Sequence, residues 1–546
     1  MSKSLQDLVN YFSFHHYIAF LPILIATLVF IRYTYQLIQG KANIKWYWLS
    51  VILFVLFVRS NDFYLNFINP DEEQWLICAN SMLIAPLSYL DGFYLFDATR
   101  ILTILPLSIF GFFTSFLDYE HARILNLSLF LFYFYIQFML IKILFDLKTS
   151  VFVTSFAVLF FSVSKMPDLV AYNSEIPALF LLTLALYLFK SAIYSGVSKN
   201  HNAYLIGLVI GLVPFAKEQA LFITVLTFLF FASYWFIQKD YSKILFASLG
   251  GTTALFIFIF PLLRNNGITD FIWIIQNAAE YAKYGLKMDK SAVSGKGIKL
   301  LKSVWLNKEL FLLFSLAIIS FGLQVFSYAI GKSKIALTNL YFLLLFLVTL
   351  YTIYLPGNFF FHYTIFLLLP LSFLLAWLYF NYSGKIQTSL LIPLVLLTLF
   401  VSKVYDRNWR LFYPVLEIFT PDLVDTSDPV YKLITEYSKP GDRMLIWGWA
   451  NHYYLSTKMQ RASGFLYPQF AMGVYSGKKR ANEFYLNNVK KFRPEVIVEL
   501  AGKGRFFFDN KWEHSIQNNA PDLYKEILGK YDKLKEDSNF VFYKRK

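Results

Sequence analysis

The stretch NPDEEQWLI, Asn69 to Ile77, contains three consecutive carboxylates, Asp71, Glu72 and Glu73, just beyond an apolar run. Of the 546 residues, 57% are hydrophobic, 20% are aromatic and only 16% are charged. Apolar runs recur along most of this length, which is typical of a polytopic membrane protein. Carboxylates at a membrane edge are costly, so we expect these three to have a function.

Apolar windows of about 20 residues, the length of helix that crosses a bilayer, predict about twelve membrane spans. A further apolar run, 101–117, contains Pro106 and Gly111 and follows a polar stretch. These features favour a juxtamembrane helix on the outer surface, with an ordinary span as the alternative. The predicted spans are 17–38, 46–60, 124–145, 150–166, 176–195, 203–216, 220–237, 244–263, 306–328, 336–355, 363–380 and 388–404.

Short basic loops indicate which side of the membrane is cytoplasmic, because lysine and arginine resist translocation. Lys41, Lys148 and Lys332 lie in loops between alternate pairs of predicted spans. The opposite loops, including the first outer loop 61–123, are therefore expected to face outward, as is everything after Ser402. We interpret the chain as a multi-pass protein of the plasma (inner) membrane.

The C-terminal part, 406–546, has a mixed polar composition that predicts a small extracytoplasmic α/β domain after a transmembrane domain over 1–405. Segment 431–449 is typical of a helix, a Pro-Gly turn and a buried strand, and 493–502 of a second strand. From residue 426 onward, 21 Lys and Arg exceed 13 Asp and Glu by eight, over half of the chain's +15. This surplus favours an anionic membrane or substrate, with a merely solvated face as the alternative. Nucleic acid is not expected as a partner on this side of the membrane.

Several short motifs, in order along the chain, resemble the GT-C superfamily of membrane glycosyltransferases, especially glycosyltransferase family 39 and the aminoarabinose transferases of lipid A. Asp71-Glu72 resembles the first-loop Asp-Glu pair of that family. Gly207 and Gly211, followed by Lys217, are similar to its glycine-spaced helix that ends in lysine. A Lys-Pro-Pro element used by some aminoarabinose transferases is missing. Further similar segments are Leu90-Asp91-Gly92, Asp97-Ala98-Thr99, Asn173 to Pro177, Gly357-Asn358 and His362-Tyr363.

The resemblance implies an all-α polytopic membrane domain of GT-C type. It also implies transfer of a sugar, with inversion, from a polyprenyl-phosphate donor to a protein, lipid or glycan acceptor on the outer face. Such a reaction needs a base for the acceptor hydroxyl and cations or donors for the departing phosphate. By position, Asp71 matches the family's first carboxylate and is the predicted base, with Glu72 orienting a neighbour or the acceptor. The alternative is that these acids only mark the hydrated end of a span.

Two basic residues are candidate phosphate ligands. Lys217 lies in an apolar neighbourhood where an unpaired ammonium would be expensive. Its alternatives are a pair with Glu218 and snorkelling to the interface. Arg264 can contact two phosphate oxygens at once, although basic residues commonly end membrane spans.

Two further positions are candidate substrate-binding sites. His362, with Tyr363 beside it, lies at a predicted membrane edge and could donate to phosphate or position the acceptor. An ordinary interfacial histidine is the alternative. Glu175 could bind sugar hydroxyls or cap a helix.

No metal and no separate cofactor are expected. The histidines show no paired spacing with carboxylates or the single Cys78, although Asp71 and a distant Glu175 could hold a divalent ion. Nucleotide-binding glycine motifs are absent from the sequence, so an activated lipid donor would supply the energy. Alternative functions are a transporter or flippase of lipid-linked saccharides, and a polymerase or ligase of surface polysaccharide. The polar groups gather at one predicted surface and not at mid-membrane, which favours a transferase over a transporter.

Overall fold

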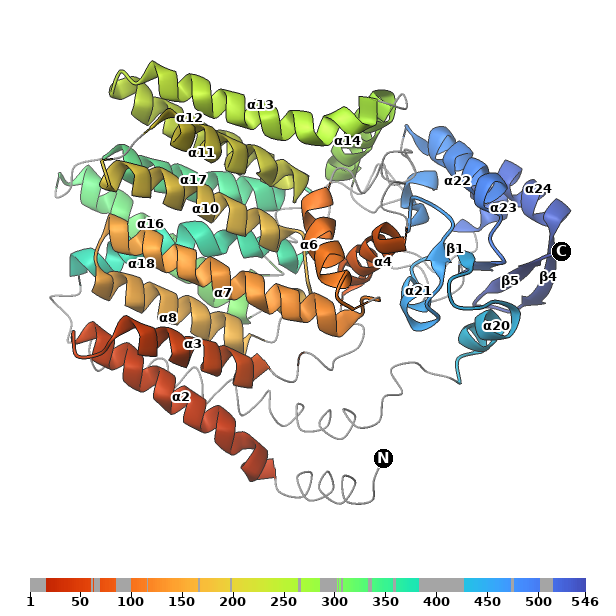
Figure 1. The fold of residues 1–546 in the computed structure, drawn as a ribbon, viewed down its shortest axis with the longest axis horizontal. Helices are drawn as coiled ribbons and strands as arrows, with labels where there is room; N and C mark the ends of the chain where they lie inside the picture. Colours follow the sequence, from red (N-terminus) through yellow and green to blue (C-terminus); the bar gives the residue numbers. More distant parts are fainter. Residues whose placement is uncertain are drawn as a thin grey trace.

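The structure, a computed structural model, consists of a helical bundle, a small C-terminal α/β domain, and short helices between them (Figure 1). It describes residues 16–59, 62, 69–84, 100–114, 116–164, 167–196, 199–263, 267–284, 302, 304–305, 308–331, 336–356, 360–382, 427–472, 476–500 and 514–546.

Long apolar helices run side by side in the bundle (Figure 1). A helix occupies each of the first eleven predicted spans, and the twelfth, 388–404, lies outside the described residues. Among the described residues, six helical segments are long and apolar enough to cross a bilayer, so twelve spans stay a prediction: α7, α10, Glu218–Ile237 (which includes α12), α13, α17 and Phe361–Tyr382 (which includes α18). The bundle helices are α2 (His16–Ile38), α3 (Ile44–Arg59), α7 (Tyr119–Leu144), α8 (Leu147–Val163), α10 (Glu175–Tyr194), α11 (Asn200–Leu212), α12 (Leu221–Ile237), α13 (Tyr241–Leu263), α16 (Lys308–Ala329), α17 (Leu337–Tyr354) and α18 (Leu368–Tyr382).

Helices α11 and α13 pack with their backbones in contact. A Cβ atom added to Gly207 would lie 1.9 Å from the Ala247 carbonyl oxygen. One added to Gly250 would lie 2.0 Å from the Tyr204 carbonyl oxygen. Small residues that allow such close approach are typical of helix pairs in membranes. The glycine-spaced pattern before Lys217 therefore has a packing role in this chain.

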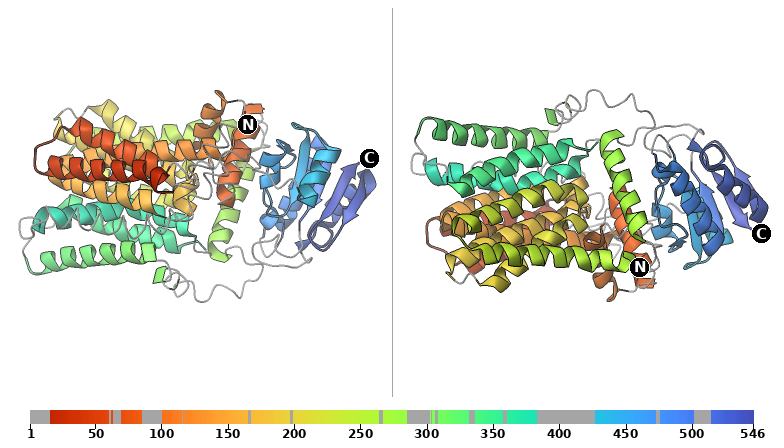
Figure 2. Two further views of the ribbon diagram at one scale, coloured as in Figure 1. Left: turned by 90° about the horizontal axis from the view of Figure 1, so that it is seen from below. Right: turned by 90° about the horizontal axis from the view of Figure 1, so that it is seen from above.

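Three helices lie between one end of the bundle and the C-terminal domain (Figures 1 and 2): α4 (Pro70–Ile84), α6 (Ile101–Gly111) and α14 (Gly267–Tyr284). Both views show α6 and α14 crossing the direction of the bundle helices. At 1.5 Å per residue, α6 is about 16 Å long, roughly half the thickness of a hydrocarbon core. This length favours the predicted juxtamembrane placement of the run 101–117.

The C-terminal domain contains a five-stranded sheet in the order β2-β1-β3-β5-β4. Strands β2 and β3 are parallel to β1, β5 is antiparallel to β3, and β4 is antiparallel to β5. The predicted helix, turn and strand of 431–449 are confirmed as α20 and β1, and the second predicted strand as β3. The strands are β1 (Arg443–Trp447), β2 (Gln460–Arg461), β3 (Val496–Glu499), β4 (Tyr531–Glu536) and β5 (Val541–Arg545), and the helices are α20 (Pro429–Tyr437), α21 (His452–Ser456), α22 (Lys478–Phe492), α23 (Ile516–Asn519) and α24 (Pro521–Lys530).

Successive side chains of a strand point to opposite faces of a sheet, and here the two faces belong to two different buried clusters. Leu445 and Trp447 share one cluster with Trp273 of α14. Ile446 lies in the other cluster, which also contains Trp75 of α4. Helices α4 and α14 therefore contribute to the hydrophobic core of the C-terminal domain.

Replacing Gly207 with alanine is expected to destabilise the protein by about 1–3 kcal/mol, because the new methyl group would overlap backbone atoms of α13. A lower apparent unfolding temperature in detergent measures this effect. Gly322→Ala in α16 is the matched control, since no atom lies within 4 Å of its added Cβ. Equal unfolding temperatures for the two variants would contradict the close packing.

Candidate functional site

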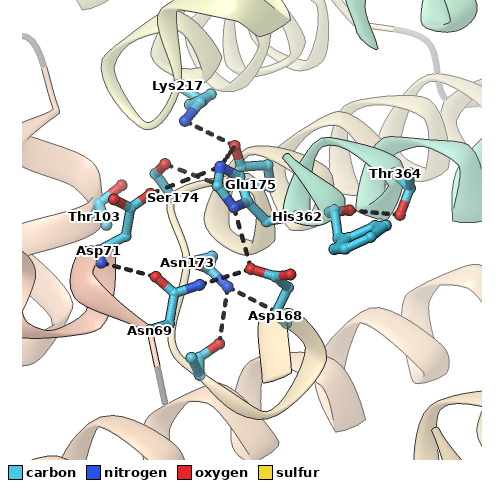
Figure 3. A network of polar contacts seen from close by, with 12 residues as sticks. Asn69, Asp71, Thr103, Asp168, Asn173, Ser174, Glu175, Lys217, His362 and Thr364 are labelled. Carbon is cyan, nitrogen blue, oxygen red and sulfur yellow. Dashed lines mark hydrogen bonds and ion pairs between the residues drawn. The ribbon is translucent and has the colours of Figure 1, made fainter. Parts of the chain in front are cut away.

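Acidic and basic side chains from segments far apart in the sequence meet around His362 (Figure 3). The ring atom Nδ1 lies 3.2 Å from Asp168 Oδ1. On the other side of the ring, Nε2 lies 3.7 Å from Asp71 Oδ2 and 3.9 Å from Glu175 Oε1. Glu175 Oε1 is also 2.7 Å from Lys217 Nζ. Three carboxylates and two basic groups thus share one site.

The Asn-Pro-Asp sequence sets the position of Asp71 at the start of α4. Pro70 is the first helical residue, where its missing N–H has no cost. Asn69 Oδ1 accepts a hydrogen bond of 2.8 Å from the Asp71 backbone N–H, a local turn that asparagine favours. Asn69 Nδ2 donates to Asp168 Oδ1 at 2.6 Å. The Asp71 side chain is 29% exposed, which makes it the most accessible carboxylate of the site.

Glu175 and Lys217 form a buried ion pair at the ends of two bundle helices. Glu175 is the first residue of α10, and Lys217 lies between the short helices η3 (Val213–Phe215) and η4 (Glu218–Ala220). Both side chains are almost completely inaccessible to solvent. Removing one partner would leave a buried charge uncompensated, which costs several kcal/mol in typical cases. The predicted alternative, a pair between Lys217 and Glu218, is wrong, because Lys217 contacts Glu175.

Arg100 is a basic residue of this region that the sequence reasoning missed. Its guanidinium contacts both carboxylate oxygens of Glu218, with Nε 2.9 Å from Oε2. It also lies over the ring of Trp75 at 5.4 Å. About a fifth of the Arg100 side chain is exposed, so it is more accessible than Lys217. The sequence feature that could have identified Arg100 is its position at the boundary between a polar stretch and the apolar run 101–117.

Asp168 is the second missed residue. It lies in the four-residue helix α9 (Pro167–Val170) and receives hydrogen bonds or close contacts from Asn69 and His362. The Asn173 side chain donates to its backbone carbonyl at 2.7 Å. In the sequence, nothing distinguishes this aspartate from other loop carboxylates, because its partners lie about a hundred residues before and two hundred after it.

Of the three consecutive carboxylates, only Asp71 faces the site, because successive helical residues point about 100° apart. Glu72 is buried and pairs with Arg123 Nη2 at 3.1 Å. It also accepts a hydrogen bond of 3.0 Å from the Tyr172 backbone N–H, just before Glu175. Burial raises the pKa of Glu72, and Arg123 opposes this shift. Glu72 therefore supports the backbone of the site and does not line it.

Glu73 points toward α7 and the C-terminal domain. The Tyr119 hydroxyl donates to Glu73 Oε1 at 2.7 Å, and the His452 backbone N–H also donates to this carboxyl group. Burial raises the pKa of Glu73 to about 8, although both hydrogen bonds act in the opposite direction. Glu73 is therefore protonated at neutral pH. Its hydrogen bonds join α4 to α7 and to the C-terminal domain.

The remaining predicted residues have different outcomes. The ring of Tyr363 lies 5.4 Å from Lys217 Nζ and packs at 84° to the ring of His362, so Tyr363 belongs to the site. It is part of the short helix η6 (Phe361–Leu367). Arg264 lies outside the described residues. Glu175 is not distant from Asp71, since both approach the same ring nitrogen of His362.

Among the described residues, no group of three or more His, Cys, Asp or Glu side chains is arranged to hold a metal ion. The carboxylates of the site instead contact Asn69, His362 and Lys217. Independence of a metal stays a prediction.

No protein-family model matches the chain, and neither does any curated protein. Among solved structures, ArnT from Cupriavidus metallidurans bound to undecaprenyl phosphate aligns over 91% of this chain and 97% of that chain, with a TM-score of 0.54 and 10% identity. The chain has the fold of ArnT. This alignment shows the fold, and for the fold it confirms the resemblance seen in the sequence motifs.

Two structures of the Archaeoglobus fulgidus oligosaccharyltransferase also align, each with 11% identity. The apo form covers 92% of this chain and 75% of that chain, with a TM-score of 0.47. AglB in complex with an inhibitory peptide and a dolichol-phosphate covers 92% and 74%, with a TM-score of 0.42.

Glu73→Gln is expected to make stability less dependent on pH. The folded state holds the Glu73 proton up to about pH 8, whereas the unfolded state releases it near pH 4.5. Stability of the wild type therefore falls as pH rises between these values, and the glutamine variant lacks this contribution. Apparent unfolding temperatures of both proteins from pH 5 to 8 measure the difference.

Glu120→Gln, which removes an exposed carboxyl group on α7, controls for the loss of one acidic residue. Parallel pH curves for wild type and Glu73→Gln would show that Glu73 is ionised in the folded protein, against this expectation.

Proposed function

We propose that this protein is an integral membrane glycosyltransferase. It transfers one sugar from a polyprenyl-phosphate carrier to an acceptor hydroxyl at the outer face of the membrane, with inversion. The observation that carries the proposal is the combination of an accessible carboxylate, Asp71, with the cations Lys217 and Arg100 at the end of an apolar bundle. The fold supports it, because the aligned ArnT structure is bound to undecaprenyl phosphate.

In the proposed reaction, Asp71 accepts the proton of the acceptor hydroxyl as its oxygen attacks the sugar carbon. The bond from that carbon to the carrier phosphate breaks, and the phosphate leaves with the electron pair. Attack from the face opposite the phosphate inverts the configuration. A positioned base contributes typically 10²–10⁴-fold to such a step. No cofactor takes part, because the donor bond is already activated.

Arg100 and Lys217 are the proposed ligands of the departing phosphate. Both cations are held by carboxylates, Arg100 by Glu218 and Lys217 by Glu175. Arg100 is the more exposed and can present two N–H groups to phosphate oxygens. Lys217 contributes from deeper in the site. Arg264 stays a candidate for the same role.

His362 is proposed to hold the Asp71 and Glu175 side chains in a fixed position relative to each other. Its Nδ1 contacts Asp168, and Asp168 is in turn bound by Asn69. This chain of contacts restrains the ring, so that Nε2 faces Asp71. Tyr363 packs against both His362 and Lys217 and is proposed to help hold these two side chains in place.

The acceptor is proposed to approach from the side of the C-terminal domain, which we assign to the extracytoplasmic space. Protein, lipid and glycan acceptors all present a hydroxyl group that Asp71 can deprotonate. The net positive charge of this domain suits an acceptor or membrane surface that carries negative charge.

Asp71→Asn is expected to lower sugar transfer by about 100-fold or more, since the amide cannot accept the proton. Purified protein in lipid vesicles is incubated with a panel of radiolabelled polyprenyl-phosphate sugars and membrane extract as acceptor. Asp240→Asn is the control, because Asp240 pairs with Lys243 at the turn between α12 and α13. The control variant is expected to retain wild-type transfer.

Two results would overturn the proposal. Full transfer by Asp71→Asn would remove Asp71 from the mechanism. Absence of transfer from every donor, together with movement of a lipid-linked saccharide across the vesicle membrane, would identify a transporter.

A further inference from the structure

One face of α14 is docked against the C-terminal domain. The Trp273 ring meets Phe465 at 5.7 Å between centroids, nearly at right angles. About two turns further along α14, Glu280 Oε2 accepts a hydrogen bond of 2.8 Å from the Ser476 backbone N–H. The domain approaches so closely that a Cβ on Gly477 would lie 2.3 Å from Trp273 Nε1. This face is therefore fully occupied.

The opposite face of α14 is an exposed apolar stripe. Its members are Ile268, Ile272, Ile275 and Ala279, and each isoleucine is 41–50% exposed. The spacing of four, three and four residues keeps these side chains within an arc of roughly 60° on a helix. An apolar stripe opposite a docked face is typical of a helix that packs against a second apolar environment on that side.

The preceding helix also carries exposed apolar side chains. In α13, which is long and apolar enough to span a membrane, Phe256, Ile257 and Phe260 are 50–58% exposed. Such side chains on a membrane-spanning helix face lipid. Only residues 264–266 separate the two helices, and α14 crosses the end of the bundle instead of continuing along it (Figure 2).

We propose that the isoleucine stripe of α14 lies in the interfacial layer of the lipid bilayer. In that position the stripe is buried about 5–10 Å into the boundary between headgroups and acyl chains. The opposite side of the helix carries the C-terminal domain. Helix α14 thus fixes the height of this domain above the membrane.

Site-directed fluorescence quenching in vesicles tests this placement on the full-length protein. A fluorophore is attached to Ile272→Cys in a Cys78→Ala background, since Cys78 is the single cysteine. Phe256→Cys reports a lipid-facing site on α13. Leu534→Cys reports an exposed apolar position on β4, one of the two edge strands of the described sheet in the C-terminal domain.

The label at position 272 is expected to be quenched several-fold more by spin-labelled lipid than the label at 534, and several-fold less by aqueous iodide. Iodide quenching equal to that at 534 would overturn the proposal. Protection from both quenchers, with a dimer detected by crosslinking, would show that a second copy of the chain covers the stripe, which also overturns it.

A second inference concerns Tyr467 and rests on the proposed function. The Tyr467 hydroxyl, from the loop before helix η8 (Pro468–Ala471), donates to the Pro70 carbonyl at 2.6 Å. This carbonyl belongs to the peptide bond that leads into Asp71. From the same domain, Arg461 Nη1 contacts Cys78 Sγ at 3.4 Å, further along α4. We infer that Tyr467 is a positioning residue for the Asp71 carboxylate.

Tyr467→Phe is expected to lower kcat several-fold and to leave the KM for the donor unchanged, because it loosens the base without touching the phosphate site. Tyr485→Phe is the matched control. Its buried hydroxyl also donates to a backbone carbonyl, that of Phe465, but does not contact α4. Equal kcat values for the two variants would overturn the role of Tyr467.

This outcome is distinguishable from failure of the proposed function. If the proposed function is wrong, the wild type itself will transfer no sugar. A lower unfolding temperature in Tyr467→Phe than in Tyr485→Phe, with equal kcat, would assign the hydrogen bond a structural role only.

Discussion

The rest of the structure depends on the cost of burying charge beside an apolar bundle. Without water, a lone carboxylate or ammonium is expensive, so each buried charge near the bundle end has a partner of opposite sign or a hydrogen-bond donor. Glu175 holds Lys217, Glu218 holds Arg100, and Glu72 holds Arg123. These pairs join α4 to α7, the start of α10 to the turn between α11 and α12, and that turn to the start of α6. The two cations of the proposed chemistry, Arg100 and Lys217, therefore also help to hold this end of the bundle together.

Electrostatic pairing also explains how a ligand-free site can keep cations ready for phosphate. A carboxylate that neutralises Arg100 or Lys217 in the absence of donor lowers the cost of burying the cation. In the proposed reaction, the carrier phosphate would replace part of that interaction with its own negative charge. Asp71 differs from Asp168 and Glu175, the other acids around His362, because it stays partly exposed, as the proposed base must to meet an incoming hydroxyl.

The C-terminal domain and the bundle share their core, which bears on how the site is held. Trp75 of α4 lies in the cluster under one face of the sheet, and Trp273 of α14 lies in the cluster under the other. The sheet is thus fixed between a helix that carries the predicted base and a helix with an apolar stripe. The sequence predicted a separate outer domain, because its composition changes after about residue 406. It could not predict the shared core, since α4 and β1 are more than 350 residues apart.

The sequence by itself determined the membrane class of the chain, the positions of the apolar bundle helices, and the first helix and two of the strands of the small domain, α20, β1 and β3. These features follow from hydrophobic periodicity and turn residues, which are local properties. Motif resemblance also found Asp71, Glu175, Lys217, His362 and Tyr363, which the fold brings together. Tertiary structure alone decided that Glu72 and Glu73 turn away, that Lys217 pairs with Glu175, and that Arg100 and Asp168 belong to the region. The physical reason is that direction around a helix and contact across the bundle depend on packing between segments far apart in the chain.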